Sequence, residues 1–487
     1  MAKVKLSSDW EGYVTRKGKI MAQNNIKSLE NDLWESADAL REGSKLSSQE
    51  YCMPVLGLIY LRYAFTRFKY VEQEILKDRP SRNGVKLPVE SSDFKSKSAI
   101  FLPEEARYDY LLNLPSEKNL GEAVDKAMEL IEKECPDLSG ILPKNYKTIF
   151  KNDLLKDLLR LFNNDALNEI KDDVIGRIYE YFLNKFAKNI ASDDGVFFTP
   201  KSLVRMIVNI IQPSYGKVLD PACGSGGMFV SSGDFVTENG INANDKLTFF
   251  GQEKVEFNAK LCKMNMAVHG LNASIISGDE ANSFYNDYHK LEGKCDFVMA
   301  NPPFAGDIKE NTIISRYELG KNSTGKWQKK VSRDILFIER NLSFLKPGGR
   351  MAIVLPQGRF NNASDKAIRD FIVERCRILA VVGLHGNVFK PHTGTKTSVL
   401  FVQKWDDVLC PRKDDYPIFF ATMQKPSKDN SGDKIYVKNP ETGENLLDSH
   451  GHLIVDHDLY NHDGMTQDGI AEAFAEFAKR EGLSFFQ

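Results

Sequence analysis

A glycine-rich turn and three acidic residues have the types and spacing in this sequence that best suit chemistry. The run Asp220-Pro-Ala-Cys-Gly-Ser-Gly-Gly227 follows the apolar pair Val218-Leu219, so Asp220 is expected to end a strand and the glycines to form a turn. Glu253 follows a second apolar run, and Asp279 follows a third. Glycine lets the backbone adopt positive φ and approach a ligand closely. The pattern predicts a binding site for a ligand that donates hydrogen bonds to carboxylates.

The spacing of the glycines narrows the class of ligand. It differs from the GxGxxG fingerprint of dinucleotide-binding proteins, and no Lys-Ser/Thr pair completes a phosphate-binding P-loop. S-adenosylmethionine presents ribose hydroxyls, an adenine amine and a cationic amino acid, which three carboxylates can bind. Each acid taken singly is equally well explained as a solvated loop residue or a helix cap. The residues predicted to form a site for S-adenosylmethionine are Asp220, Gly224, Ser225, Gly226, Gly227, Glu253 and Asp279.

A second motif follows the apolar run from Asp296 to Ala300. It consists of Asn301, Pro302, Pro303 and Phe304. Prolines and asparagine also end strands and form turns, which is the alternative explanation. Because the motif follows the fourth strand after a cofactor-type turn, we predict that it lies in the same crevice and acts in catalysis.

The elements that must position these residues alternate along the chain. Short β-rich runs separated by helical stretches favour an α/β fold, with a doubly wound, mostly parallel sheet that binds ligands at the carboxyl ends of its strands. The predicted strands are 218–219, 247–250, 274–276, 296–300, 350–355, 379–384 and 398–403.

The remaining chain is assigned from its periodicity and composition. A length of 487 residues predicts two or three domains. Apolar residues at helical spacing indicate an α-helical N-terminal domain. The predicted organisation is a polar leader over 1–25, the helical domain over 26–191, a catalytic domain over 192–405 and a C-terminal region over 406–487 that ends in a short helical tail.

The overall composition excludes several classes of protein. The formal charge of −2 gives no global basic field, so contact with a nucleic acid must be local or shared with another subunit. The seven cysteines lie far apart without a CxxC pair, so neither a disulfide framework nor a metal site is predicted. With no signal peptide and no membrane-spanning segment, we expect a cytoplasmic protein without membrane contact.

The motif Asp220–Gly227, followed by Asn301–Phe304, resembles those of amino-directed DNA methyltransferases of the N6-adenine type. Further segments are similar to the modification subunit of type I restriction-modification systems. These are 31–34, 55–61, Asp173-Val-Ile-Gly-Arg-Ile-Tyr-Glu-Tyr-Phe182 and Gly195-Val-Phe-Phe-Thr-Pro-Lys201. The likeness covers nearly the whole chain and is most specific in its middle third.

The resemblance implies a role for each site residue. Gly224 to Gly227 would approach the body of S-adenosylmethionine, Glu253 would bind its ribose and Asp279 its adenine. A further set would pack over the methionine end of the cofactor: Val196, Phe197, Phe198, Thr199, Pro200 and Lys201.

The catalytic motif has roles that suit methylation of an amine. The Asn301 side chain and the Pro302 carbonyl would accept the two N6 hydrogens of adenine, and the prolines would fix that geometry. Phe304 would stack on the base once it is flipped out of the duplex.

The resemblance also implies partners. These are double-stranded DNA with a flipped adenine, a specificity subunit that binds two modification subunits, and a restriction subunit in the complete complex, which needs the modification subunit to restrict unmodified DNA. About 80 polar, turn-rich residues follow the last predicted strand, so no separate target-recognition domain is expected.

Two alternatives to this function remain. An NPP motif also suits methylation of a glutamine amide in protein, although that family usually has tyrosine at the fourth position and lacks the helical domain. A non-catalytic DNA-binding scaffold is the other alternative, against which the complete cofactor and catalytic motifs argue.

Two further segments carry expectations. Residues 305–330 hold six cations against three acids, which favours a mobile lid that contacts DNA phosphates over an ordinary surface loop. The amphipathic C-terminal helix, with Ile470, Phe474, Phe477 and Ala478 on one face, either packs on its own domain or docks on the specificity subunit. We favour docking, because Phe485 and Phe486 make the terminus unusually apolar.

Overall fold

The computed structural model describes residues 28–82, 85–95, 99–164, 173–190, 198–322, 324–448, 453–462 and 469–486. The chain forms two compact units. Unit 1 comprises the chain up to Ile190 together with Gly443–Ile454, and unit 2 comprises Ala191–Thr442 and Val455–Gln487. The predicted polar leader, 1–25, lies outside the described residues.

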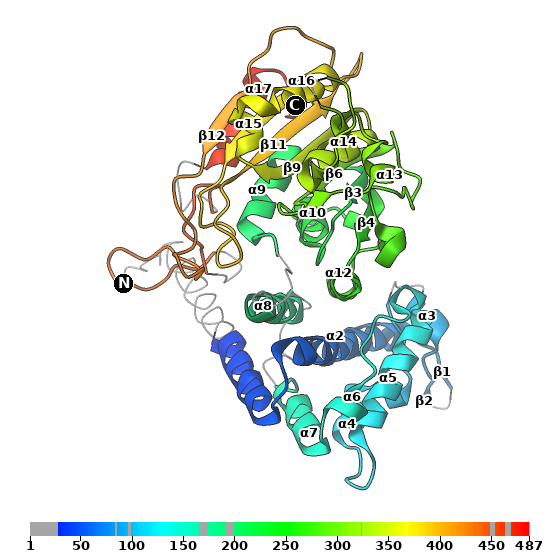
Figure 1. Cartoon of the computed structure of the whole chain (residues 1–487). Helices are drawn as coiled ribbons and strands as arrows, with labels where there is room; N and C mark the ends of the chain where they lie inside the picture. Colours follow the sequence, from blue (N-terminus) through cyan, green and yellow to red (C-terminus); the bar gives the residue numbers. More distant parts are fainter. Residues whose placement is uncertain are drawn as a thin grey trace, which may run out of the picture. The chain divides into compact units, whose positions relative to one another are not determined.

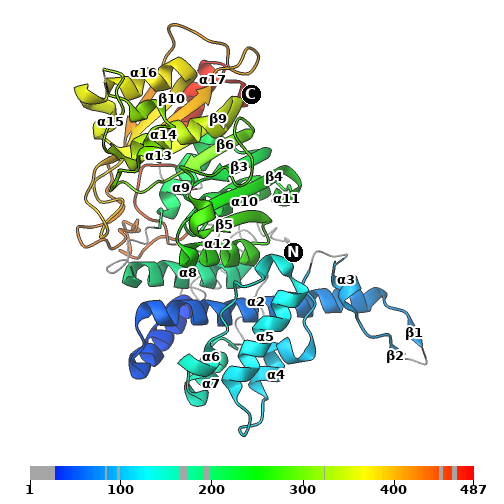
Figure 2. The same ribbon diagram turned by 45° about the vertical axis from the view of Figure 1, so that its right-hand side comes forward.

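Unit 1 is helical (Figures 1 and 2). Ser47 and Glu50 cap its longest helix reciprocally, each side chain accepting a hydrogen bond from the other residue's backbone N–H. Trp34 meets Phe182 and Phe186 edge-on, with ring centroids 5.3 and 5.0 Å apart, so helical residues 28–44 and the last helix share one core. The elements are α2 (Ser48–Asp78), β1 (Ser81–Arg82), β2 (Val85–Lys86), α3 (Ser91–Lys95), η1 (Glu104–Ala106), α4 (Tyr108–Leu112), α5 (Leu120–Glu134), η2 (Pro136–Leu138), α6 (Tyr146–Ile149), α7 (Asn152–Leu161) and α8 (Asp173–Ile190).

Unit 2 is built on an eight-stranded sheet with the order β12-β10-β11-β9-β6-β3-β4-β5. β11 pairs antiparallel with both neighbours, and the other pairings are parallel. The strands are β3 (Gly216–Asp220), β4 (Leu247–Glu253), β5 (Ala273–Ser277), β6 (Cys295–Ala300), β9 (Leu345–Pro356), β10 (Cys376–Gly383), β11 (Thr397–Lys404) and β12 (Phe419–Thr422). The predicted fold class is therefore confirmed.

Helices cover both faces of this sheet (Figures 1 and 2). Successive residues of a strand point to opposite faces, so Val218 belongs to one hydrophobic core and Leu219 to the other. The first core contains residues of α9 (Lys201–Ile211), α10 (Gly227–Thr237), α12 (Glu256–Val268) and α17 (Ile470–Arg480). The second contains residues of α13 (Asn311–Ile314), α14 (Arg333–Phe344) and α16 (Lys366–Arg375). The shorter elements are α11 (Ala243–Lys246), η4 (Gly278–Ala281), β7 (Asp307–Ile308), η5 (Glu318–Gly320), β8 (Val331–Ser332), α15 (Gly358–Asn361), η6 (Ala363–Asp365) and η7 (Ser484–Phe486).

The strand order reverses beside β3. From β3 the chain adds β4 and β5 on one side, and then crosses to place β6 on the other. In open parallel sheets, ligands bind at the carboxyl ends of the strands at such a reversal. The ends of β3 and β6 are Asp220 and Ala300, so the glycine turn and Asn301 both begin there.

The C-terminal region differs from the prediction. Phe474 and Ala478 of α17 are fully buried in the first core, and Phe474 lies edge-on against Phe419 of β12 with ring centroids 5.6 Å apart. The apolar face of the helix is therefore covered by its own unit, which corrects the expectation that this face docks on a partner. The predicted region 406–487 is also not one body, because Gly443–Ile454 belongs to unit 1.

The expectation of a mobile lid over 305–330 is also corrected. β7 pairs with β8 at the base of the segment, and Ile313, Ile314, Tyr317 and Leu319 are buried in the second core. The Glu339 carboxylate of α14 accepts hydrogen bonds from two backbone N–H groups of η5 at 2.8 Å each. Most of the segment is therefore an integral part of unit 2. None of the helices that the structure describes is long and apolar enough to cross a membrane.

Candidate active site

The glycine turn joins β3 to α10 and combines two kinds of glycine. Gly224 and Gly226 have φ of 52° and 80°, a region that L side chains rarely adopt. A side chain at Gly226 would meet the Cys262 sulfur at 2.8 Å, so this glycine allows the turn to pack on α12. A side chain at Gly224 or Gly227 would enter open space. The turn is thus packed against the protein on one side and open on the other.

Glu253, the last residue of β4, ties this turn to the neighbouring strand. One carboxylate oxygen accepts from Gly224 N at 3.0 Å and the other from Val255 N at 2.8 Å. Burial raises the pKa of Glu253, and these two hydrogen bonds oppose the rise. Because each carboxylate oxygen has two lone pairs, Glu253 keeps acceptor capacity for a ligand hydroxyl.

Asp220 lies beneath the turn. Its side chain is 3% exposed and accepts a hydrogen bond from Ala222 N at 3.0 Å. Burial raises the pKa of Asp220 to about 8, and the nearby Glu253 carboxylate adds to the rise. This residue supports the shape of the turn, while Asp279, which follows β5 in η4, is exposed. Glu253 is in register with Ser277, two residues before Asp279, so the two carboxylates follow neighbouring positions of paired strands.

Asn301 follows β6 and makes a contact that the sequence did not predict. Its amide nitrogen donates to the Thr199 hydroxyl oxygen at 3.1 Å. Its carbonyl oxygen is buried and has no hydrogen-bond partner among the described residues. A buried acceptor without a partner is costly in a folded protein, which makes such an atom a candidate for binding a ligand hydrogen.

The rest of the catalytic motif forms a short wall beside Asn301. Pro302 is buried, Pro303 is exposed and Phe304 is half-buried. The Phe304 ring meets Phe389 edge-on, with ring centroids 5.4 Å apart. The buried Phe389 thereby fixes one edge of Phe304, a contact that sequence spacing could not indicate.

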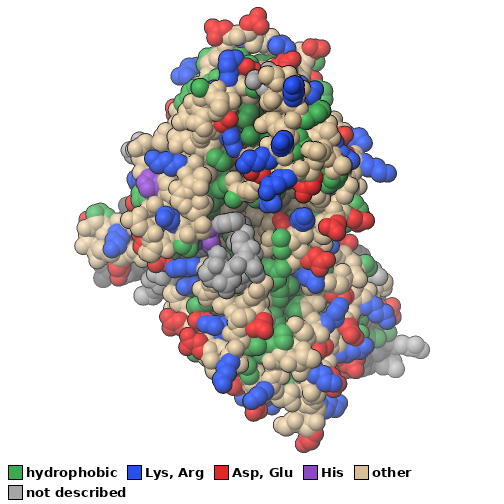
Figure 3. Space-filling view, viewed as in Figure 1, with side chains coloured by type: hydrophobic (Ala, Val, Ile, Leu, Met, Phe, Trp, Pro, Cys, Tyr) green, Lys and Arg blue, Asp and Glu red, His purple; other side chains and the backbone are tan. Residues whose placement is uncertain are grey.

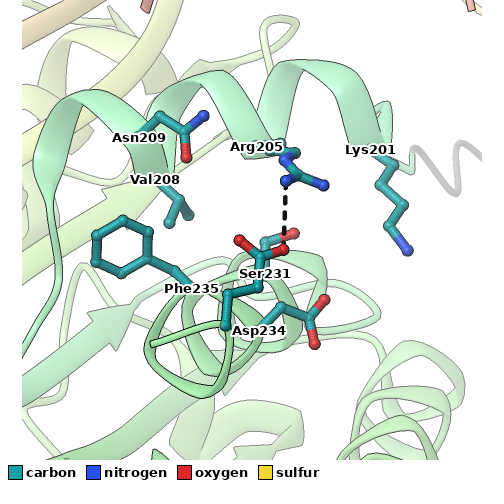
Figure 4. Close-up of a pocket in the computed structure, with 8 residues that line it drawn as sticks. Lys201, Arg205, Val208, Asn209, Ser231, Asp234 and Phe235 are labelled. Atoms are coloured by element: carbon teal, nitrogen blue, oxygen red, sulfur yellow. Dashed lines mark hydrogen bonds and ion pairs between the residues drawn. The ribbon is translucent and has the colours of Figure 1, made fainter. Parts of the chain in front are cut away.

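The predicted segment 196–201 is described only in part. Val196 and Phe197 lie outside the described residues, whereas Phe198, Thr199 and Pro200 lead into α9 and are half-buried. Lys201 is exposed and lines a pocket between α9 and α10, together with Arg205 and Asp234 (Figure 4). Arg205 also forms an ion pair with Glu238 there, at 3.2 Å. No residue of the glycine turn lines this pocket, so Thr199 and Lys201 face different surroundings.

Two residues of α12 belong to the site without having been predicted. Asn265 donates from its amide to Ser225 O at 3.0 Å, which holds the glycine turn against the helix. The Asn258 side chain donates a hydrogen bond to Glu253 and opposes the burial-induced rise of its pKa. Asparagines at a seven-residue spacing, with Asn265 inside an apolar stretch, were the available signal.

These groups fit S-adenosylmethionine. The open side of Gly224 and Gly227 leaves space for a ligand against the backbone, and the carboxylates of Glu253 and Asp279 supply acceptors for hydroxyl and amine groups. The unpartnered carbonyl oxygen of Asn301 lies at the end of the adjacent strand β6. The arrangement combines a cofactor cradle with an acceptor for the hydrogens of an amine.

Family comparisons agree with this chemistry. Residues 170–452 match the N-6 DNA methylase family model, and residues 29–162 match the HsdM N-terminal domain. The MjaIX methylase subunit, a type I restriction enzyme subunit of Methanocaldococcus jannaschii, is 31% identical over 77% of this chain and 69% of its own length. The HindI methylase subunit of Haemophilus influenzae is 31% identical over 56% of this chain, and the match spans 62% of that protein.

A solved structure shows the same fold. It is the methyltransferase subunit of a type I restriction-modification system from Streptococcus thermophilus, with a TM-score of 0.63 and 20% identity, and the match covers 78% of this chain and 85% of that one. The family does not favour methylation of a protein glutamine. With S-adenosylmethionine as the methyl donor, the chain belongs to the N-6 DNA methylases, as a methylase subunit of the type I restriction-modification family.

Proposed function

We propose that Asn301 carries the chemistry of this methylase by accepting a hydrogen from the N6 amine of adenine. The single observation that supports this role is the buried carbonyl oxygen of Asn301, which has no partner among the described residues. Thr199 accepts a hydrogen bond from the nitrogen of the same amide, which leaves the carbonyl oxygen of Asn301 for the substrate. The two residues together form an acceptor that is oriented before adenine binds.

The reaction needs such an acceptor because the N6 lone pair is delocalised into the purine ring. As the nitrogen attacks, its N–H groups become more acidic and positive charge develops on the amine. The carbonyl oxygens of Asn301 and Pro302 stabilise that charge by accepting the two hydrogens, and a neutral amide suffices because attack precedes loss of the proton. Pro302 and Pro303 restrict the backbone that carries these oxygens.

The cofactor supplies an electrophilic methyl group on a sulfonium. On the protein side, Gly224 to Gly227 allow close approach of the backbone, while Glu253 accepts hydrogens from ribose hydroxyls and Asp279 from the adenine amine. Asp220 and Ser225 act through the shape of the turn, since the first is buried beneath it and the second is held by α12. We propose that Phe198, Thr199 and Pro200, the described residues of segment 196–201 that precede α9, pack over the methionine end.

Phe304 gives the flipped adenine a flat surface on which to stack. The ring is half-buried, and Phe389 supports one of its edges. Stacking on an aromatic side chain is worth about 1 to 3 kcal/mol per base. This contribution helps to offset the cost of taking the base out of the duplex.

We further propose the assembly that the family suggests. Two copies of this chain bind one specificity subunit, which selects the sequence in double-stranded DNA, and a restriction subunit joins the complete complex. The near-neutral charge of the chain fits an enzyme that shares DNA binding with other subunits. Free cysteines fit a reducing cytoplasm.

The test of the proposed function is the Asn301→Ala variant. Loss of an acceptor that acts mainly in the transition state should lower the rate of methyl transfer to DNA roughly 10²- to 10³-fold. The affinity for S-adenosylmethionine, measured by calorimetry, should stay within about twofold of the wild-type value. A variant with near wild-type turnover would show that Asn301 is not the acceptor.

A further inference from the structure

We propose that residues 320–322 and 324–330, here named the lysine hairpin, form a hydrogen-bonded surface that binds DNA beside the methylated base. The hairpin lies next to α13 (Figure 1). This inference rests on the proposed function, because it takes DNA as the substrate. It goes beyond that function by assigning a second surface, outside the crevice, with its own contacts to phosphate and to a base or sugar.

The described residues of the hairpin form a closed turn. Asn322 N donates to Lys326 O at 2.9 Å, and Lys321 pairs with Trp327 across the two arms. The Asn322 side-chain oxygen accepts from the backbone N–H groups of Thr324 and Lys326, each at 3.0 Å. Gln328 N donates to Gly320 O at 2.9 Å and closes the base. The turn is held by hydrogen bonds within the protein.

The base of the hairpin is anchored to the unit that carries the active site. Leu319 and Val331, on either side of it, are both buried in the second core. β8 follows the hairpin directly and pairs with β7, which begins three residues after Phe304. The chain therefore returns from the hairpin to the immediate neighbourhood of the catalytic motif. A surface already ordered in this way loses little conformational entropy when it binds.

The charge of the hairpin suits a polyanion. It contains Lys321, Lys326, Lys329 and Lys330, and the sequence has no acidic residue between Glu318 and Asp334. Lys330 pairs with Asp307 at 3.1 Å, whereas Lys326 and Lys329 are exposed and form no ion pair with any described residue. Lys and Arg side chains project from the right-hand edge of the sheet unit in Figure 3, the edge at which Figure 1 labels α13. In a chain with net charge −2, this cluster stands out.

Trp327 adds a feature that a purely electrostatic surface lacks. Its side chain is 46% exposed, and Lys321 Nζ lies 4.8 Å from the centroid of its ring. A large exposed aromatic ring held by a cation is suited to stack on a base or a sugar while the neighbouring lysines bind phosphates. A DNA duplex opened by base flipping offers both phosphates and an unstacked base or sugar, which favours it over an acidic protein surface.

The test uses the full-length chain and the salt dependence of its binding to a duplex of mixed sequence. The double variant Lys326→Gln, Lys329→Gln should lower the slope of log affinity against log salt by about 1 for each lysine. The matched control is Lys246→Gln, Lys413→Gln, two exposed lysines of the same unit, which should leave the slope unchanged. An unchanged slope in the hairpin variant, or a wild-type chain that does not bind the duplex at low salt, overturns the proposal.

Trp327 is tested separately from the lysines. Trp327→Ala should weaken binding about 5- to 150-fold without changing the salt slope, and Trp327→Phe should restore most of the affinity. Binding of DNA should quench the tryptophan fluorescence of the wild-type chain more than that of Trp327→Phe. If the wild type, Trp327→Ala and Trp327→Phe bound DNA with equal affinity, Trp327 would not contact DNA.

Failure of this inference can be distinguished from failure of the proposed function. All hairpin variants should bind S-adenosylmethionine with wild-type affinity, since the hairpin lies outside the cofactor site. If Asn301→Ala abolishes methylation while the hairpin variants bind DNA normally, only the inference about the lysine hairpin is contradicted. If the hairpin variants lose DNA affinity as expected while Asn301→Ala methylates normally, only the catalytic proposal is wrong.

Discussion

The amide of Asn301 is useful to catalysis only in one orientation. Rotation by half a turn would place the NH₂ group where an acceptor is needed, and both ends of an amide occupy nearly the same space. The hydrogen bond from the Asn301 nitrogen to the Thr199 hydroxyl holds the amide in place and leaves its oxygen for the substrate. Thr199 is therefore proposed as a positioning residue in addition to its place beside the cofactor.

Substitution of Thr199 tests this positioning role. Thr199→Val keeps the shape of the side chain but removes its hydroxyl, so kcat should fall about 5- to 10-fold, the value of one lost hydrogen bond. Thr199→Ser retains the hydroxyl and should restore most of kcat. Steady-state kinetics on DNA would measure both variants. A large change in the affinity for S-adenosylmethionine with kcat unchanged would instead assign Thr199 to cofactor binding alone.

Glu253 gives cofactor binding a predictable dependence on pH. Burial raises the pKa of this carboxyl, so it takes up a proton at a higher pH than an exposed glutamate does. The ionised form is the better acceptor for ribose hydroxyls, so affinity for S-adenosylmethionine should be full above the raised pKa and fall as the pH drops through it. Calorimetry across this range would measure the effect. In Glu253→Gln the affinity should be lower by about 1 to 3 kcal/mol and the dependence on pH should flatten.

The sequence indicated the site residues better than it indicated their partners. Glycine and proline motifs mark local backbone geometry, so Gly224–Gly227 and Asn301–Phe304 could be assigned to strand ends from local pattern alone. The contact between Asn301 and Thr199 joins residues 102 positions apart, and its existence depends on how the segment before α9 passes the end of β6. Local spacing carries no information about such a contact.

At the scale of elements, the same limit applies to the edge of the sheet. The central strands carry apolar runs because both of their faces are covered. β12 is a four-residue edge strand in which Phe420 and Thr422 are exposed; its run from Ile418 to Ala421 follows a charged stretch and was not predicted as a strand. The amphipathic pattern of α17 was evident, but periodicity shows only that a face is buried and not which surface covers it.

The burial of α17 predicts a structural role for its apolar face. Phe474 is 0% exposed, so Phe474→Ala should destabilise unit 2 by about 3 to 5 kcal/mol. Chemical denaturation followed by circular dichroism would measure the loss. The control Glu476→Ala, on the exposed face of the same helix, should change stability by less than about 0.5 kcal/mol. If the two variants were equally stable, α17 would not belong to this core.

At the scale of the whole molecule, the two units are connected more than once. The chain leaves unit 1 after Ile190, returns to it at Gly443 and leaves again after Ile454. Leu447 pairs with Leu453 within this excursion, and Tyr436 pairs with Val455 at its base. The excursion could not be predicted from composition, because its polar, turn-rich sequence resembles any surface loop.

This connection predicts the behaviour of a cleaved chain. A protease site built between Ile190 and Phe198 would separate the two units covalently, but residues 443–454 of the second fragment would still be part of unit 1. We expect the two fragments to co-elute on gel filtration under native conditions and to separate in urea. In a control chain whose residues 443–454 are replaced by a Gly/Ser linker, the cleaved fragments should separate without denaturant. Co-elution in that control would show that other contacts hold the units together.

The returning segment also sets an order of events during synthesis on the ribosome. The helices of unit 1 have all been translated by Ile190, yet the unit lacks part of its structure until Ile454 has been added. At an elongation rate of about 5 to 20 residues per second, this interval lasts roughly 13 to 50 s. During that time unit 1 has its helices but lacks the segment Gly443–Ile454. The strands of the sheet of unit 2 leave the ribosome in the same interval. Unit 1 can therefore be completed only after the residues of the glycine turn and of the catalytic motif have been translated.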